Sequence, residues 1–358
     1  LIMKKIVFTN ILVFFALIAI IEIFFGYWFD KNNFGILMRK HRMQTSYYEV
    51  KFNDKIYRHV YKRNFYGFRG EEVEPKNQEI IFIGGSTGNQ RFTPEEYTIV
   101  GKINSDLENR GINKKIYNAS MDGKSTFGII NDFEFWFPKL KDFKPKLFIF
   151  YIGLNDKFYR GNCQLNNSEK FDGNDCQISF DLKNRIIDYI KNNSITYYLA
   201  KKVKYKYIKT ESKIRYDFFG YAKKDILYKD YHYINYEEAK KIHYSVEKTQ
   251  DEIFIENELK KRLIRLSQYV NKYNASAIYI TQVQHDGLGN RNLFFANEAV
   301  KKFCRNNGYD LIPLDEIANM EINDFYDPWH TTLKGTDRVK NYLAPKIIQK
   351  IKKIYVNN

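Results

Sequence analysis

The feature that most constrains this chain's fold is a series of short apolar runs separated by longer stretches with helical character. The runs cover residues 79–85, 114–120, 146–153, 276–283 and 309–315. Short continuous apolar runs are typical of strands buried on both faces of a parallel sheet. Their alternation with helices predicts an α/β fold with helices on both faces of that sheet.

The stretches between the runs carry helix signals. Helices are predicted over residues 93–111, 125–140, 249–274, 292–308 and 332–354. In the first of them, Thr93 suits the N-cap, Pro94 the first turn and Gly111 the stop.

The alternation pauses between residues 157 and 248, where Tyr, Lys and Asn are abundant. We interpret this segment as a long, partly helical insertion. A long insertion in a compact domain often covers the site and sets its specificity.

An apolar run over residues 6–29 is about the length that a helix needs to cross a bilayer. Glu22 would be costly near the bilayer centre, whereas Tyr27 and Trp28 close the run as interfacial aromatic residues do. No small-residue cleavage site follows the run, which favours an uncleaved membrane anchor over a signal peptide.

These patterns divide the chain into three parts. Residues 1–29 form the predicted anchor, residues 30–77 a polar and aromatic membrane-proximal segment, and residues 78–358 the main domain with its insertion. Basic residues flank the anchor on both sides, so the charge pattern leaves its orientation open.

The net charge of +16 indicates an anionic partner or surface. The chain shows no basic helix with base-reading residues and no zinc-finger spacing, so we expect a membrane or an acidic polymer rather than nucleic acid. None of the three cysteines lies in a CxxC pair, and no structural zinc is expected. Cys163 and Cys176 flank a polar loop and either form a disulfide or remain thiols. A disulfide would favour a domain outside the cytoplasm, periplasmic or extracellular.

Ligands of parallel sheets bind beyond the carboxyl ends of the strands. The first run is followed by GGSTG at 84–88, the second by SMDGKS at 120–125, and the third reads into GLND at 153–156. The loop after the last run contains DPWH at 327–330. The first turn is not a phosphate loop, because it lacks the G-K-[ST] of that motif, and the G-x-G-x-x-G spacing also fails.

These loops contain the parts of a nucleophilic site. Ser86 needs a base and an acid that orients the base, and His330 and Asp327 are candidates for these roles. Acyl transfer also needs donors for the developing oxyanion, which Gly123 can offer from its backbone and Asn155 from its side chain.

The four segments IGGSTG, NASMDGKS, GLND and DPWH resemble the blocks of the SGNH (GDSL-like) hydrolase family, with Gly85 in place of the usual Asp. The resemblance covers roughly residues 78–156 and 275–355. It implies a three-layer α/β/α sandwich of flavodoxin-like type and a hydrolase that uses no metal or cofactor. It further implies the triad Ser86, His330 and Asp327, and an oxyanion hole formed by Ser86, Gly123 and Asn155.

The predicted function is that of a serine esterase acting on an O-acylated carbohydrate, an envelope polymer or a lipid-like ester. An O-acyltransferase with the same triad is the alternative, and an inactive binding module is a third reading. His285 and Trp329 are candidate substrate-binding residues. Asp156 is expected to stabilise the GLND loop by hydrogen bonding, and Asp324 is a competing candidate for the triad acid.

Overall fold

The described residues of the computed structural model are 2–26, 28, 44–52, 55–156, 187, 190, 193–197, 199–200, 215–217 and 232–355. Most of the predicted insertion, including Cys163 and Cys176, lies outside the described residues. The disulfide therefore stays a prediction.

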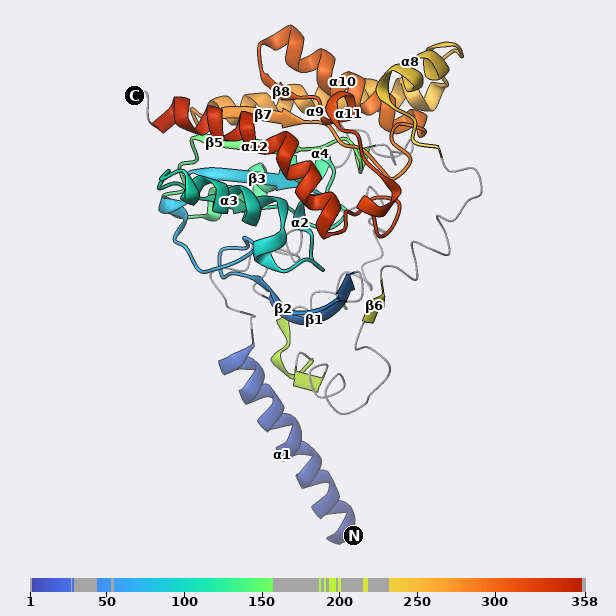
Figure 1. The fold of residues 1–358 in the computed structure, drawn as a ribbon. Coiled ribbons are helices and arrows are strands. Elements are labelled where there is room, and N and C mark those ends of the chain that lie inside the picture. The colour runs from blue at the N-terminus through green and yellow to red at the C-terminus, as the bar shows by residue number, and fades with distance from the viewer. Residues whose placement is uncertain are drawn as a thin grey trace.

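The centre of the fold is a five-stranded parallel sheet (Figure 1). Its strands are β3 (Ile80–Gly84), β4 (Ile116–Asn118), β5 (Leu147–Tyr151), β7 (Ser276–Ile280) and β8 (Asp310–Ile312). They lie in the order β4-β3-β5-β7-β8. In chain order within the sheet this is 2-1-3-4-5, the flavodoxin-like arrangement, so the predicted sheet and its type are confirmed.

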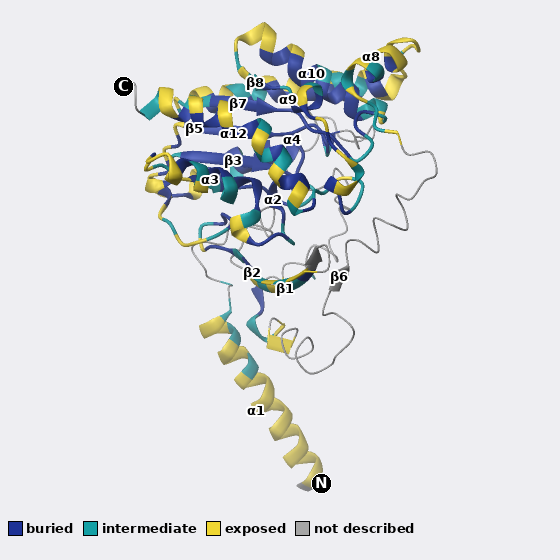
Figure 2. Ribbon diagram, viewed as in Figure 1, coloured by how far each residue is buried: buried dark blue, intermediate teal, exposed yellow. Residues whose placement is uncertain are grey.

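Helices cover both faces of the sheet, as the dark blue interior in Figure 2 shows. Along β3, Ile80 and Phe82 belong to the core under α3 (Ile99–Asn109) and α12 (Leu333–Tyr355). The alternate residues Ile81 and Ile83 belong to the core on the other face. That second core is built from α4 (Thr126–Asn131), α9 (Gln250–Lys272) and α10 (Arg291–Asn307). The three-layer sandwich is therefore confirmed.

Two predicted helices differ in detail. The helix predicted to start at Thr93 begins at Ile99, with Thr98 as its N-cap accepting from the Gly101 N–H at 2.9 Å. Residues Glu95–Tyr97 form a separate 3₁₀ turn, because the extended backbone of Thr98 interrupts the helix. The helix predicted over 125–140 comprises α4, a π-helical turn at Asp132–Trp136 and a 3₁₀ turn at Phe137–Lys139.

No strand is predicted within residues 30–77, yet the structure has an antiparallel hairpin there. It consists of β1 (Gln44–Phe52) and β2 (Lys55–Arg63), and the short strand β6 (Arg215–Asp217) adds in parallel to β1. Buried Val50 of β1 packs in one cluster with Tyr326. The hairpin therefore contacts the loop that carries DPWH.

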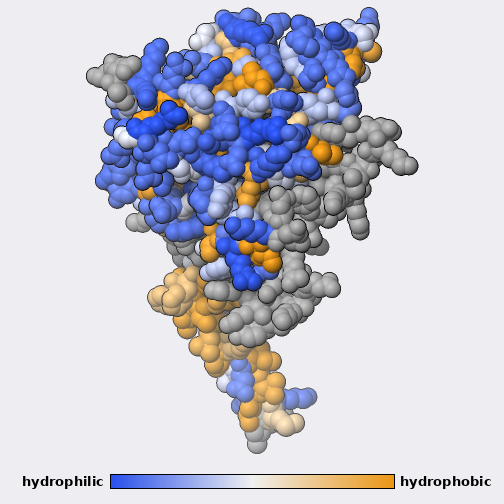
Figure 3. All heavy atoms as spheres, in the orientation of Figure 1, coloured by the Kyte–Doolittle hydropathy of each residue, from blue (hydrophilic) through white to orange (hydrophobic). Residues whose placement is uncertain are grey.

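Helix α1 (Ile2–Phe25) extends away from the sandwich, and its side chains are largely exposed (Figure 3). Its segment Met3–Phe25 has a mean hydropathy of 2.6 and is long and apolar enough to cross a membrane. Near its end, the Glu22 carboxylate accepts hydrogen bonds from Trp28 Nε1 at 2.7 Å and from Ser194 Oγ at 2.6 Å. The backbone N–H of Thr196 donates to the same carboxylate at 3.0 Å. These partners offset the desolvation of this acidic side chain and join α1 to the described part of the insertion.

Cys304 lies in the core on α10, fully buried. Burial raises the pKa of its thiol to about 12. We expect iodoacetamide at pH 8 to leave Cys304 unmodified in the folded protein and to alkylate it in guanidinium, because the thiolate is the reactive species. Mass spectrometry of tryptic peptides measures this. Rapid alkylation of Cys304 in the folded protein would contradict the burial. Labelling of Cys163 and Cys176 with and without reductant tests the disulfide in the same experiment.

Candidate active site

The structure places each predicted site residue after the strand that the sequence analysis assigned to it. Ser86 follows β3, Gly123 follows β4, and Asn155 follows β5. Asp327 and His330 follow β8, after the short helix α11 (Leu314–Ile317) and a 3₁₀ turn at Ile322–Asp324. The carboxyl ends of parallel strands meet at one edge of the sheet, and each of these residues follows a strand that ends there.

Ser86 is the first residue of α2 (Ser86–Asn89), a single helical turn that starts directly after β3. Gly85 is its N-cap, with an extended backbone, and the Gly85 carbonyl accepts from Gly88 N at 3.1 Å and from Asn89 N at 2.9 Å. The Ser86 side chain is partly exposed. Its backbone N–H belongs to the first turn, where helical N–H groups have no partner within the helix. Ser86 therefore combines an accessible hydroxyl with an N–H suited to an anionic oxygen.

Gly85 leaves no room for a side chain. A Cβ at this position would lie 2.1 Å from the Asn155 amide nitrogen and 3.1 Å from the Lys124 carbonyl oxygen. The Asn155 amide therefore packs directly against the residue that precedes Ser86. A side chain at position 85 would force the Asn155 amide to move.

The loop after β4 is held against the turn that carries Ser86. The Met121 N–H donates to the Gly84 carbonyl at 3.0 Å, and the Asn155 side chain donates to the Lys124 carbonyl at 2.8 Å. Gly123, between them, has φ of +75°, a backbone conformation that favours glycine. The Asn155 amide has two hydrogens, so one remains for another acceptor.

Asp156 stabilises the loop after β5, as predicted. Its carboxylate accepts from Thr126 Oγ1 at 2.6 Å and from the Gly153 N–H at 3.3 Å, and it lies 3.4 Å from the Arg262 guanidinium. All of these groups are buried, so the network holds in place the loop that carries Asn155.

His330 and Asp327 form a close pair, with 2.7 Å between Nδ1 and Oδ2. The other carboxylate oxygen accepts the backbone N–H groups of Trp329 and His330, each at 2.8 Å. Burial by itself would raise the pKa of Asp327, but the hydrogen bond from His330 and the two backbone N–H groups outweigh it and lower that pKa. An ionised Asp327 selects the tautomer with its proton on Nδ1, which leaves Nε2 as an acceptor. The Tyr326 ring stacks on the imidazole with a 5.5 Å centroid separation.

Among the described residues, no hydrogen bond joins the Ser86 hydroxyl to the His330 ring. Catalytic hydrogen bonds are often long before substrate binds. The joint role of these two residues therefore remains a prediction.

Asp324, the competing acid, is buried and lies 2.9 Å from Arg338 Nε. It also accepts from the Glu321 N–H at 2.7 Å. It serves the turn before the DPWH loop, and Asp327 is the carboxylate that contacts the imidazole.

The two candidate substrate-binding residues both adjoin this loop. The backbone N–H of His285 donates to the Pro328 carbonyl at 3.0 Å, and its ring nitrogen Nδ1 lies 3.2 Å from the same oxygen. His285 therefore supports the loop. Trp329 is 39% exposed beside His330, with ring centroids 6.5 Å apart. Contact of either residue with substrate stays a prediction.

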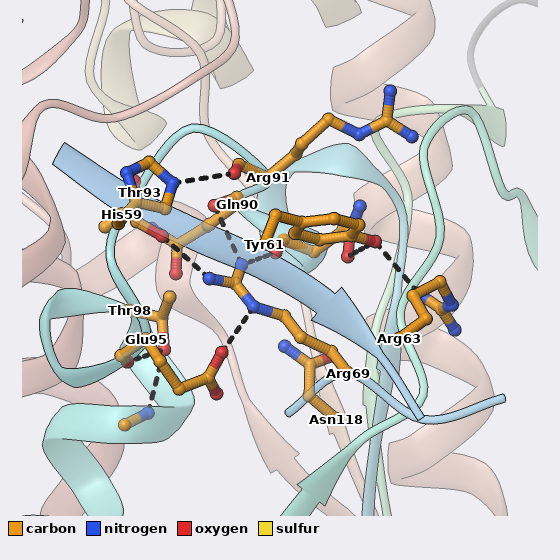
Figure 4. Close-up of polar contacts among 12 residues, drawn as sticks. His59, Tyr61, Arg63, Arg69, Gln90, Arg91, Thr93, Glu95, Thr98 and Asn118 are labelled. Atoms are coloured by element: carbon orange, nitrogen blue, oxygen red, sulfur yellow. Dashed lines mark hydrogen bonds and ion pairs between the residues drawn. The ribbon is translucent and has the colours of Figure 1, made fainter. Parts of the chain in front are cut away.

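Two polar residues that support the turn of Ser86 are not predicted from the sequence. Buried Gln90 has φ of 45°, and its side-chain amide donates to Thr336 Oγ1 at 2.9 Å while its oxygen accepts the Ile99 N–H at 2.7 Å. Arg69, from the turn after β2, contacts the segment that follows α2 (Figure 4). Arg69 lies within NFYGFRGEE at 64–72, a sequence that identifies no partner for its side chain.

No protein-family model and no curated protein sequence matches this chain. Among solved structures, TesA aligns with a TM-score of 0.42 and 11% identity, covering 75% of this chain and 97% of TesA. The acetylxylan esterase Axe2 from Geobacillus stearothermophilus aligns with a TM-score of 0.41 and 11% identity, covering 76% of this chain and 96% of Axe2. A lipolytic protein of the G-D-S-L family from Veillonella parvula has a TM-score of 0.38 and 13% identity, covering 74% and 95%. These similarities are too distant to assign an activity to this chain. A function is therefore proposed from the geometry of its own site.

Proposed function

We propose that this chain is a serine ester hydrolase with Ser86 as nucleophile, His330 as general base and Asp327 as the acid that orients the imidazole. The observation that carries the proposal is the half-buried Asp327–His330 pair in the loop after β8, together with Ser86 after β3 and the Asn155 amide packed against Gly85. A serine hydroxyl alone is a weak nucleophile, and such a pair is what activates it.

The mechanism follows from these positions. His330 Nε2 takes the proton of the Ser86 hydroxyl while Asp327 holds the proton on Nδ1 and stabilises the imidazolium. The serine oxygen adds to the ester carbonyl. The N–H groups of Ser86 and Gly123 and the free hydrogen of the Asn155 amide then bind the oxyanion. His330 returns the proton to the leaving alcohol, and water releases the acyl group by the same steps.

For the substrate we propose an O-acylated carbohydrate or envelope polymer reached from a membrane-anchored position outside the cytoplasm. The apolar α1, the basic net charge and the exposed indole of Trp329 beside the base support this choice. Aromatic faces are suited to binding the apolar faces of sugar rings. The test is a panel of acetylated glycans and longer acyl esters. Preference for long-chain esters over acetylated glycans would contradict the carbohydrate assignment.

The same residues could pass the acyl group to a sugar hydroxyl. Product analysis with and without a glycan acceptor separates the two reactions. Hydrolysis predicts free acid at the same rate in both cases, whereas transfer predicts acylated acceptor in place of free acid.

The contact between Gly85 and Asn155 gives a specific prediction. In Gly85→Ala the new Cβ displaces the Asn155 amide, removing one oxyanion donor, and we expect kcat to fall about 10²- to 10³-fold. Steady-state hydrolysis of p-nitrophenyl acetate measures this. Gly308→Ala is the matched control: its Cβ meets nothing within 4 Å and its φ is +68°, so it should cost about 1 kcal/mol of stability with kcat unchanged. Wild-type kcat in Gly85→Ala would contradict the assigned role of Asn155.

A further inference from the structure

The turn after β2 places Arg69 against the sandwich. The Asn64 side-chain oxygen accepts the N–H groups of Tyr66 at 3.1 Å and Phe68 at 2.9 Å, and Gly67 and Gly70 have φ of 91° and 105°. These interactions close a tight turn. The Arg69 N–H then donates to the Asn118 carbonyl at 2.9 Å, which docks the turn on the end of β4.

From this position the Arg69 guanidinium contacts the backbone at the end of α2 and in the segment that follows it (Figure 4). It donates to the carbonyl oxygens of Asn89, of Gln90 at 2.8 Å and of Thr93 at 2.7 Å. Its Nε donates to the Glu95 carboxylate at 2.6 Å, which supplies the opposite charge. The Arg69 side chain is almost fully buried, so its hydrogen bonds to the buried carbonyl groups form in a low-dielectric surrounding where they are strong, whereas the Glu95 carboxylate is partly exposed and its ion pair is screened by water.

These contacts fix the end of α2. The last carbonyls of a helix have no partner within it, and Gln90 also holds a left-handed backbone that costs free energy for a non-glycine residue. Arg69 binds both the last carbonyl of α2 and that of Gln90. Because α2 is a single turn, Ser86 lies at its other end, about 5 Å along the helix axis.

A second chain of contacts runs from β2 to the loop of Gly123. The Tyr61 hydroxyl of β2 donates to Asn89 Oδ1 at 3.1 Å, and Asn89 Nδ2 donates to Asp122 Oδ1 at 2.6 Å. Arg91 holds the other oxygen of Asp122 at 2.9 Å. Tyr61 also lies alongside the Arg69 guanidinium, 5.3 Å from ring centroid to Cζ. Asn89 therefore links the helix of Ser86 to the residue before Gly123.

From these contacts we propose that Tyr61, on β2, and Arg69, in the turn after β2, are positioning residues for the ester-hydrolase site. Arg69 fixes the helical turn that carries Ser86, and Tyr61 acts through Asn89 on the loop that carries Gly123. Neither residue touches substrate. The inference rests on the proposed function, because it assigns Ser86 and Gly123 their catalytic roles.

The test uses the full-length chain with Arg69→Lys, which keeps the charge but removes the multiple hydrogen bonds, and Tyr61→Phe, which keeps the shape but removes the hydroxyl. Arg58→Lys is the matched control, since Arg58 lies on β2 with Tyr61 and its exposed side chain pairs with Glu49. A fluorophosphonate is titrated against each variant. The labelled fraction reports folded sites, and the labelling rate reports how well Ser86 is positioned. Hydrolysis of p-nitrophenyl acetate supplies kcat and KM.

We expect Arg69→Lys to lower kcat and the labelling rate about 10- to 100-fold, the scale of a misplacement near 1 Å, while KM and the labelled fraction stay at wild-type values. Tyr61→Phe should show a smaller fall of the same kind, and Arg58→Lys no change. The pH midpoint of kcat/KM should not move, because the His330–Asp327 pair is untouched.

A wild-type labelling rate in both Arg69→Lys and Tyr61→Phe would overturn the inference. So would a labelled fraction that falls in proportion to kcat, which would mean that the two residues serve only to keep the chain folded. If the wild-type protein itself is neither labelled nor active, the proposed function fails instead, and the inference falls with it.

Discussion

Ser86→Ala is expected to abolish ester hydrolysis, with kcat falling by on the order of 10⁶-fold, because the variant lacks the hydroxyl that would form the acyl-enzyme. The fold should be retained: Ser86 is partly exposed and lies at the first position of α2. Initial rates with p-nitrophenyl acetate and a thermal unfolding curve measure both outcomes.

Ser105→Ala is the control for this variant. Ser105 lies exposed on α3, and its hydroxyl donates to the Gly101 carbonyl one turn back. It should leave kcat unchanged. Residual hydrolysis by Ser86→Ala at a tenth of the wild-type rate or more would exclude Ser86 as the nucleophile.

Asp327→Asn should lower kcat about 10⁴-fold with little change in KM. The amide cannot favour the Nδ1–H tautomer as a carboxylate does, so Nε2 is no longer held as the acceptor for the serine proton. Asp324→Asn is the matched control, because Asp324 lies three residues away and pairs with Arg338 rather than with the imidazole. It should reduce thermal stability and retain kcat. The reverse result, with Asp324→Asn inactive and Asp327→Asn active, would reassign the acid.

The lowered pKa of Asp327 also fixes the sign of its pH dependence. A carboxyl group whose pKa is lower in the folded state stabilises the fold above its unfolded pKa of about 3.9, and this contribution is lost as pH falls through the folded value. Loss of activity at pH 5 and above therefore does not come from protonation of Asp327. Measuring both kcat/KM and the free energy of unfolding between about pH 3 and pH 8 tests this pH dependence of Asp327.

The sheet and the candidate site could be predicted from the sequence because short local segments of the chain specify both. Each strand is a continuous apolar run, and Ser86, Gly123 and Asn155 each follow one of them. The first residues of the helices were harder to predict than the strands. Thr93 and Thr98 both precede acceptable helical sequence, and only the extended backbone of Thr98 decides between them.

The residues that hold the site in place could not be predicted from the sequence, because their partners are distant in the chain. Arg69 binds the main-chain carbonyls of Asn89, Gln90 and Thr93, and a carbonyl carries no residue signature. The hairpin was missed because its tyrosines and charged residues alternate only loosely, and its burial depends on packing against Tyr326. Long-range packing of this kind overrides local propensity.

The most direct measurement of the central claim is labelling of the full-length chain with a fluorophosphonate, followed by peptide mapping. We predict one adduct per chain, on Ser86, with labelling lost in Ser86→Ala and strongly slowed in Asp327→Asn. An unlabelled wild-type protein, or an adduct on a different serine, would contradict the assignment of Ser86, His330 and Asp327 as the catalytic site.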